Sequence, residues 1–152
     1  MNTRTITVVR SRAREVMKSR SPEDTYKIAK TFGRTLRGGD VIALSGELGA
    51  GKTAFAKGIA AALGIKATVT SPTFVLMMRY GIPQKNHRKC NASFLYHIDT
   101  YRLATLHTLA QAGIAEYIGI PDAITIIEWP EKIRTLLPRT TIDVSLAVPK
   151  VI

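Results

Sequence analysis

The segment Gly46-Glu47-Leu48-Gly49-Ala50-Gly51-Lys52-Thr53 fits the phosphate-binding pattern G-x-x-x-x-G-K-[ST] at all four fixed positions. Its glycines let the backbone turn N–H groups towards a phosphate at the start of a helix, whose dipole favours anions. Lys52 then reaches the outer phosphates, and the Thr53 hydroxyl is a ligand for magnesium. The alternative is a purely structural glycine turn, but the added lysine and hydroxyl make a chance match far rarer.

The residues around this P-loop predict the strand and the helix that it needs. Val41 to Leu44 is a short, continuously apolar run, which is typical of a strand covered on both faces. Thr53 to Leu63 is rich in alanine, has apolar residues one turn apart and ends at a glycine, so it predicts a helix. We therefore expect a nucleoside triphosphate with magnesium to bind here. The absence of an Asn-Lys-x-Asp sequence, which reads guanine in GTPases, favours ATP.

The rest of the chain alternates strands with helices. Ser-Pro-Glu-Asp at 21–24 has the features of a helix start, and apolar spacing continues the predicted helix over Pro22 to Arg37. The other predicted elements are a helix over Leu103 to Ala112 and strands over Thr73 to Tyr80, Phe94 to Ile98, Ala123 to Ile127 and Thr141 to Leu146. This order predicts an α/β fold, a small P-loop NTPase domain with a mainly parallel sheet and helices on both faces.

Two segments do not predict regular elements. Residues 1–20 contain one β-branched run and a basic stretch, and we treat them as a basic N-terminal lead to a single domain over 21–152. The polar segment Gly81 to Ser93 predicts an exposed loop, and it is the best candidate for disorder.

Composition limits the possible functions. With 152 residues, 45% of them hydrophobic and 22% charged, the chain is one globular domain's worth. It has no apolar window long enough for a membrane helix and no secretory signal, so we expect a soluble cytoplasmic protein. The single cysteine, Cys90, excludes an internal disulfide and a four-thiolate zinc site. The net charge of +11 fits either phosphate-rich partners such as RNA or a solvated basic surface.

Two acids are placed to complete a magnesium site. Asp99 and Glu128 each follow an apolar strand, so both would emerge at the carboxyl edge of the sheet, where α/β folds bind ligands. Asp99 has an alternative role as a helix cap, and Glu128 as an incidental surface acid. His97 and Trp129 are more often packing residues than chemical ones in such positions.

Four segments together resemble the TsaE family, formerly called YjeE: GELGAGKT at 46–53, SPTF at 71–74, HIDTYR at 97–102 and IEWPE at 127–131. This family comprises bacterial ATPases needed to make threonylcarbamoyladenosine in tRNA. The order and spacing of the motifs match from about residue 21 to residue 131. The resemblance weakens after Pro138, and the segments 1–20 and 81–93 depart from the family pattern.

The resemblance implies a site as well as a fold. It implies that ATP contacts Thr25, Gly46, Glu47, Leu48, Gly49, Ala50, Gly51, Lys52, Thr53, Ala54 and Trp129. It implies that Thr53, Asp99 and Glu128 hold Mg²⁺, and that Lys52 acts with these two acids in hydrolysis. Thr73, in the SPTF segment, would sense the γ-phosphate.

The resemblance also implies partners. TsaE-like proteins act on a complex of TsaD, which transfers the threonylcarbamoyl group, with TsaB, and their weak, partner-stimulated hydrolysis resets that complex. Contact with tRNA would be indirect. Two other functions stay open: a small-molecule kinase, for which the basic segment around Arg88 is the one candidate lid over the phosphates, and a nucleotide-dependent binding module that does not hydrolyse.

Overall fold

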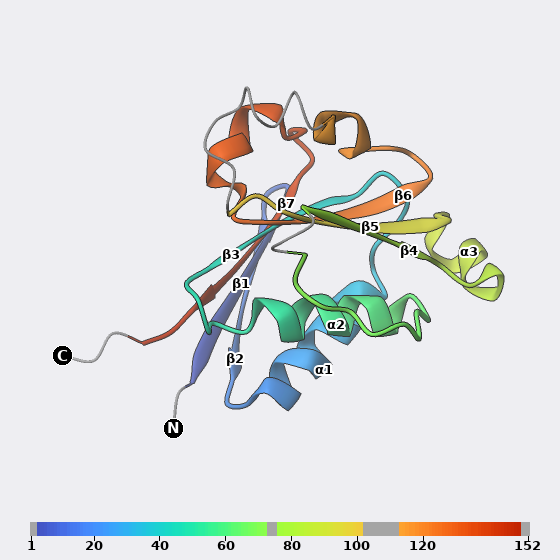
Figure 1. Ribbon diagram of the computed structural model, residues 1–152. Helices are drawn as coiled ribbons and strands as arrows, with labels where there is room; N and C mark the ends of the chain where they lie inside the picture. The colour runs from blue at the N-terminus through green and yellow to red at the C-terminus, as the bar shows by residue number, and fades with distance from the viewer. Residues whose placement is uncertain (1–2, 73–75, 102–112, 150–152) are drawn as a thin grey trace.

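The computed structural model describes residues 3–72, 76–101 and 113–149, which form one mixed seven-stranded sheet (Figure 1). The order across the sheet is β2-β1-β7-β3-β6-β5-β4. The strands are β1 (Arg4–Arg10), β2 (Ala13–Ser19), β3 (Val41–Gly46), β4 (Met77–Gly81), β5 (Phe94–Asp99), β6 (Ala123–Glu128) and β7 (Ile142–Ala147). The central strands β7, β3, β6 and β5 are parallel, whereas β2, β1 and β4 run antiparallel to their neighbours. The α/β class is confirmed, but the sheet is parallel, as expected, only at its centre.

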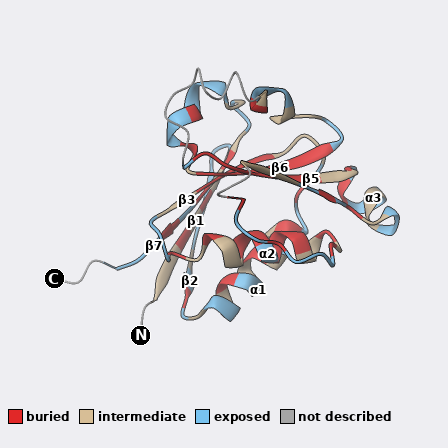
Figure 2. Ribbon diagram, in the orientation of Figure 1, coloured by how far each residue is buried: buried red, intermediate tan, exposed pale blue. Residues whose placement is uncertain are grey.

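Helical segments cover both faces of the sheet. The helices α1 (Pro22–Gly33) and α2 (Lys52–Ala62) lie together against one face, and the short 3₁₀ helices η1 (Ile114–Tyr117) and η2 (Pro130–Leu136) lie over the other (Figure 1). Helix α2 is largely buried, whereas α1 is more exposed (Figure 2) and turns its buried residues Ala29 and Gly33 towards α2. Strand β3 contributes side chains to the core on both faces of the sheet, because Ile42 packs into the larger core cluster and Val41 into the smaller one. Its continuous apolar run is explained by this two-sided burial.

The basic N-terminal segment, for which no regular element was predicted, forms a β-hairpin in the same sheet. Strand β1 pairs along its length with β2 and also with β7, the strand of highest residue number. Ile6 and Val8 of β1 are buried in the larger core cluster. The β-branched run at 6–9 is therefore an interior strand, and the charged strand β2 is the sheet edge, where charges discourage pairing with other chains.

Helix α1 begins as predicted and ends earlier. The Ser21 hydroxyl accepts a hydrogen bond from Asp24 N at 3.1 Å, and Pro22 occupies the first turn. The helix ends at Gly33 rather than at Arg37, because the next backbone bonds span three residues, as in the bond from Leu36 N to Gly33 O. This tighter turn buries Leu36 in the core.

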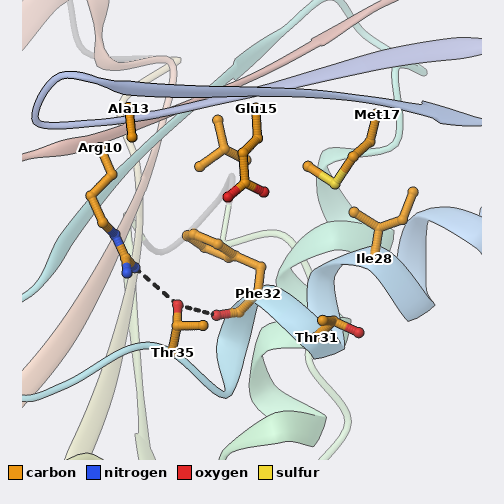
Figure 3. Close-up of a pocket in the computed structure, with 9 residues that line it drawn as sticks. Arg10, Ala13, Glu15, Met17, Ile28, Thr31, Phe32 and Thr35 are labelled. Atoms are coloured by element: carbon orange, nitrogen blue, oxygen red, sulfur yellow. Dashed lines mark hydrogen bonds between the residues drawn. The ribbon is translucent and has the colours of Figure 1, made fainter.

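The hairpin contacts α1 at its two ends and leaves a cavity between them (Figure 3). At one end Arg10 donates to Thr35 Oγ1 at 3.0 Å and lies over the Phe32 ring. At the other end the hydroxyls of Ser19 and Thr25 are 2.7 Å apart and hydrogen-bonded. The cavity has a volume of about 440 Å³ and a largely apolar lining.

The segment expected to be an exposed loop contains the helix α3 (Gln84–Cys90), which corrects that prediction. Basic residues in its last turn suit the negative end of the helix dipole. His87 Nε2 lies 2.6 Å from Ile82 O, and Cys90 is buried. The backbone at the end of α3 is also hydrogen-bonded to the turn before β3, since Gly38 N donates to Cys90 O at 2.7 Å. Helix α3 therefore lies at the edge of the sheet opposite the P-loop.

Where the structure describes them, the remaining predicted elements have the predicted type, strand or helix. Strands β3, β5, β6 and β7 and helix α2 lie within one or two residues of their expected bounds. Strand β4 is described from Met77, and residues 73–75 of its expected range lie outside the described residues. The helix expected over 103–112 also lies outside them. Of the helices in the described part of the chain, none has the length and apolar character needed to cross a bilayer.

Candidate functional site

The P-loop connects β3 to α2 and needs glycine at defined points. Strand β3 ends at Gly46, where a Cβ atom would lie 2.7 Å from the carbonyl oxygen of Leu146 in the neighbouring strand β7. Gly51, just before α2, has a φ of +106°, a backbone angle that residues other than glycine rarely adopt. The loop can therefore pass close to β7 and still present its backbone at the N-terminus of α2. This is the strand, loop and helix arrangement that the motif predicts.

The two predicted acids reach the same edge of the sheet as the P-loop. Asp99 ends β5 and Glu128 ends β6, and these residues are directly paired in the parallel register. Glu128 is also paired with Leu44, two residues before the P-loop. Both carboxylates are 3% exposed, and both line a cleft of about 470 Å³ together with the P-loop residues. The sequence prediction that strand ends bring these groups together agrees with this placement.

Lys52 lies in the cleft between its own loop and an aromatic ring. Its Nζ donates to the carbonyl oxygens of Gly46 and Glu47, and it lies 3.8 Å from the centroid of the Trp129 ring. Burial lowers the pKa of the Lys52 ammonium, while Glu128 and other nearby carboxylates act in the opposite direction. The ammonium is thus a partly desolvated cation, whose attraction to an incoming phosphate is stronger than it would be in water.

Asp99 is held from two sides. Its Oδ2 accepts a hydrogen bond from the Ser71 hydroxyl at 3.1 Å, and its Oδ1 accepts one from Tyr101 N at 2.8 Å. The second bond is the kind of contact that the cap interpretation requires, although the helix expected to follow lies outside the described residues. The two interpretations are compatible, because the carboxylate that accepts from Tyr101 N also lines the cleft.

Glu128 is held by a buried histidine. His97 Nε2 lies 2.6 Å from Glu128 Oε2, and the His97 side chain is fully buried. An ionised carboxylate only accepts hydrogen bonds, so His97 Nε2 is the donor wherever Glu128 is ionised. The surface-acid interpretation of Glu128 is wrong because the residue is buried. His97 is a core residue, as its position in a strand suggested, and it also contacts the site.

Trp129 forms one wall of the cleft. It adopts a left-handed backbone conformation, with φ at +58°, at the start of η2. Its ring packs on Tyr101 with 4.8 Å between ring centroids and lies beneath the Lys52 ammonium. The single hydroxyl hydrogen of Thr100 is shared between the carbonyl oxygens of Glu128 and Trp129, which holds these two residues in place. The ring is therefore held in place against the P-loop lysine.

The other expected nucleotide contacts are distributed over two adjoining pockets. Glu47, Leu48, Gly49, Thr53 and Ala54 line the main cleft. Leu48 is 75% exposed, whereas Ala50 is buried and lines neither pocket. Thr25 lines a smaller neighbouring pocket, which shares Gly49 and Gly51 with the cleft. Thr73 lies outside the described residues.

Residues that the sequence did not single out also line the site. Ser71 and Tyr101 belong to motifs quoted above. The Ser71 contact with Asp99 joins segments 28 residues apart, whereas the Tyr101 contact with Asp99 is local. Arg4 carried no signal other than positive charge, yet its Nη2 donates to Gly49 O at 3.1 Å. The alternation of polar and apolar residues that begins at Arg4 in strand β1 is the sequence clue that would have placed Arg4 in a strand.

The side chains near Thr53 suit a hard divalent cation. The candidate ligands, Thr53, Asp99 and Glu128, offer hydroxyl and carboxylate oxygens, which Mg²⁺ prefers. Within the described residues, no group of three or more His, Cys, Asp or Glu side chains surrounds a common point. Mg²⁺ commonly takes one or two carboxylates and completes its shell with water and substrate phosphates. The donor set therefore fits magnesium bound together with a nucleotide.

Comparisons with known proteins identify the family of this chain. Residues 19–150 match the family model described as threonylcarbamoyl adenosine biosynthesis protein TsaE. A tRNA threonylcarbamoyladenosine biosynthesis protein TsaE from Treponema pallidum is 41% identical over 130 residues, which cover 86% of this chain and 89% of the relative. The protein of the same name from Bacillus subtilis is 35% identical over 127 residues, covering 82% and 72%.

A solved structure gives the same result for the fold. The crystal structure of Bacillus subtilis YdiB matches with a TM-score of 0.67 at 28% sequence identity. The match covers 97% of this chain and 78% of that one.

Proposed function

This chain belongs to the TsaE family of threonylcarbamoyl adenosine biosynthesis proteins, and we propose that it is an accessory ATPase of that tRNA modification. It binds ATP with Mg²⁺ at the P-loop cleft, hydrolyses the nucleotide weakly alone, and hydrolyses it faster on a complex of TsaD-type and TsaB-type partners. Its contact with tRNA is indirect, through that complex, and its place of action is the cytoplasm.

The observation that carries the proposal is the meeting of three chemical groups in one cleft. The P-loop backbone offers N–H groups, Lys52 offers a partly buried cation, and Asp99 and Glu128 offer two buried carboxylates. Phosphoryl transfer needs little covalent help from a protein and depends mainly on positioning and on charge. A cleft with these groups is suited to hold a triphosphate and its metal ion.

Each group has a separate task in this proposal. Lys52 binds the outer phosphate oxygens, and the Trp129 ring keeps its ammonium beside the loop. Thr53, Asp99 and Glu128 hold Mg²⁺, which supplies neutralisation of phosphate charge when it is bound. His97 and Ser71 orient the two carboxylates through their hydrogen bonds.

The residues that line the cleft support stimulation by a partner. Among the described residues that line it, Lys52 is a cation and none is arginine. An arginine finger supplied by another protein is worth about 10³ to 10⁵ in rate for P-loop enzymes. This difference supports slow hydrolysis by the chain alone and faster hydrolysis in a complex.

The kinase alternative receives no support from the geometry. Its candidate lid, the basic segment around Arg88, lies on α3 at the opposite edge of the sheet from the P-loop. It cannot close over phosphates bound at Gly46–Thr53 without rearrangement of the sheet edge.

The test is reconstitution with purified TsaD-type and TsaB-type proteins. Phosphate release is measured for each protein alone and for the mixture, and threonylcarbamoylation of tRNA is followed over several turnovers. Lys52→Ala is compared with Lys57→Ala, which removes an exposed lysine from the same helix. We expect partner-stimulated hydrolysis, and modification that fails with Lys52→Ala alone. Hydrolysis that is equal with and without partners, together with phosphate transfer to a small metabolite, would instead favour the kinase.

A further inference from the structure

Two pockets meet at the P-loop. The main cleft lies on the side of Asp99 and Glu128, and a smaller pocket of about 190 Å³ lies on the side of Arg4 and Arg20. Both pockets are lined by Pro22, Gly49 and Gly51, so they adjoin each other at the loop. Cavities for drug-sized ligands are roughly 300–1,000 Å³, so the smaller pocket suits one part of a nucleotide rather than a whole one.

Arg4 is placed in this smaller pocket by three elements. It begins strand β1 and is paired with Ser19 of β2, whose hydroxyl bonds to Thr25 at the start of α1. Its guanidinium donates to Gly49 O in the P-loop at 3.1 Å. The hairpin, helix α1 and the P-loop therefore meet at this arginine.

The direction of a bound nucleotide follows from the position of the acids. Asp99 and Glu128 would hold the metal ion that neutralises the outer phosphates of ATP, so these phosphates belong on the side of the two acids. The α-phosphate, the sugar and the base must then leave the P-loop towards another side. The arginine pocket adjoins the cleft at Gly49 and Gly51 and contains Arg4, which bonds to the loop, and neither acid lines it.

We propose that Arg4 and Arg20 form the pocket for the nucleoside end of the ligand, with the guanidinium plane of Arg4 against the purine ring. This inference rests on the proposed function. A guanidinium is planar and weakly hydrated, and it stacks on aromatic rings more readily than an ammonium does. Pro22 adds an apolar surface, and the described lining contains neither aspartate nor glutamate. Such a lining suits an electron-rich ring attached to an anionic chain.

The family pattern does not assign this role to Arg4. The family model begins at residue 19, after the strand that carries Arg4. The proposed nucleoside pocket thus combines Arg4, which precedes the matched segment, with residues inside that segment, such as Arg20 and Pro22.

The experiment compares two ligands that share phosphates and differ in the nucleoside. The affinities of the 152-residue protein for MgATP and for magnesium tripolyphosphate are measured by calorimetry at about 0.15 M salt, where the Debye length is about 8 Å. The variants are Arg4→Ala, Arg4→Lys and the double variant Arg4→Ala/Arg20→Ala. Arg14→Ala, an exposed arginine of β2, is the matched control for charge.

We expect Arg4→Ala to weaken ATP binding by about 3- to 30-fold, as for loss of a cation–π contact, and to leave tripolyphosphate binding nearly unchanged. Retained tripolyphosphate binding also shows that the variant is folded. Arg4→Lys should remain weak, and Arg14→Ala should match the unchanged protein.

Three results would overturn the inference. Equal loss of both ligands in Arg4→Ala would assign Arg4 to the phosphates, and full ATP affinity in Arg4→Lys would exclude the planar contact. If the unchanged protein binds tripolyphosphate as tightly as ATP, the nucleoside has no pocket. By contrast, an unchanged protein that binds neither ligand would contradict the proposed function itself, and the inference with it.

Discussion

Glu128 and Asp99 are neighbours in the sheet, but different partners hold the two carboxylates. Glu128 accepts from a buried imidazole, whereas Asp99 accepts from a hydroxyl and a backbone N–H. Their positions could be predicted from sequence, because each residue ends an apolar strand. The partners His97 and Ser71 could not, because each contact joins segments about 30 residues apart.

The first prediction at this scale concerns the charge of the two acids. Glu128→Gln and Asp99→Asn keep the shape of the side chains and remove the negative charge from the metal side of the cleft. We expect kcat in the assembled complex to fall by about 10²- to 10³-fold, while ATP affinity changes little. Phosphate release and calorimetry measure the two effects. If Asp99→Asn keeps the normal kcat, then the role of Asp99 is only to accept the hydrogen bond from Tyr101 N that caps the following turn.

The second prediction concerns His97 as a positioning residue. His97→Ala removes the donor to Glu128, and a hydrogen bond to a charged group is worth about 1.5–3 kcal/mol. We therefore expect kcat to fall by about 10- to 150-fold, with little change in KM for ATP. His97→Gln places an amide near the former Nε2 position and should restore part of the rate.

A double variant separates this positioning from general damage to the core. His97→Ala combined with Glu128→Gln should cost little more than Glu128→Gln alone, because the two residues act through one contact. Additive losses, or a fall in thermal stability that accounts for the lost activity, would leave His97 with a packing role only.

At the scale of elements, helices α1 and α2 approach each other so closely that Gly58 has no room for a side chain. A Cβ atom there would lie 2.5 Å from both Ala29 Cβ and Tyr26 O. Gly33 meets α2 in the same way, with 2.7 Å to Ala62 Cβ. This contact keeps α1, and the residues at its start, beside the P-loop helix.

The third prediction follows from this contact. In an exposed helix, replacing glycine by alanine usually stabilises by about 1 kcal/mol. We expect the opposite for Gly58→Ala, a loss of about 1–3 kcal/mol in the free energy of unfolding, because the added methyl group overpacks the interface. Denaturation by urea measures it. Gly81→Ala is the control, since no atom lies within 4 Å of the added Cβ, and a similar loss there would argue against overpacking.

Prediction from sequence succeeded for the elements that surround the P-loop and failed at the periphery. The strand β3 and the helix α2 flank a motif whose fixed positions each have a physical reason. Helix α3 was missed because it is short and basic and lacks an apolar periodicity; contacts from His87 and Cys90 hold it. The hairpin was missed because its pairing partner, β7, lies more than 130 residues away in the chain.

At the scale of the whole molecule, positive charge has a more specific distribution than composition suggested. The basic N-terminal segment is part of the sheet, and it brings Arg4 to the P-loop. The other basic cluster lies on and near α3, at the far edge of the sheet. The sequence left open whether these charges attract phosphates or serve solubility. Their separation makes it necessary to ask that question for each cluster separately.

The position of β7 between β1 and β3 has a consequence for how the protein is made. Among the described strands, β1 leaves the ribosome first and β7 last, yet β7 joins them, with Thr5 opposite Ala147 and Gly46 opposite Leu146. A nascent chain therefore carries the hairpin and the P-loop strand as separate pieces until residues 142–147 emerge. Contacts between distant segments form slowly and leave apolar strand edges open to aggregation meanwhile. ATP competence is thus expected to appear only after translation of β7, and a stalled or truncated chain would be a client for chaperones.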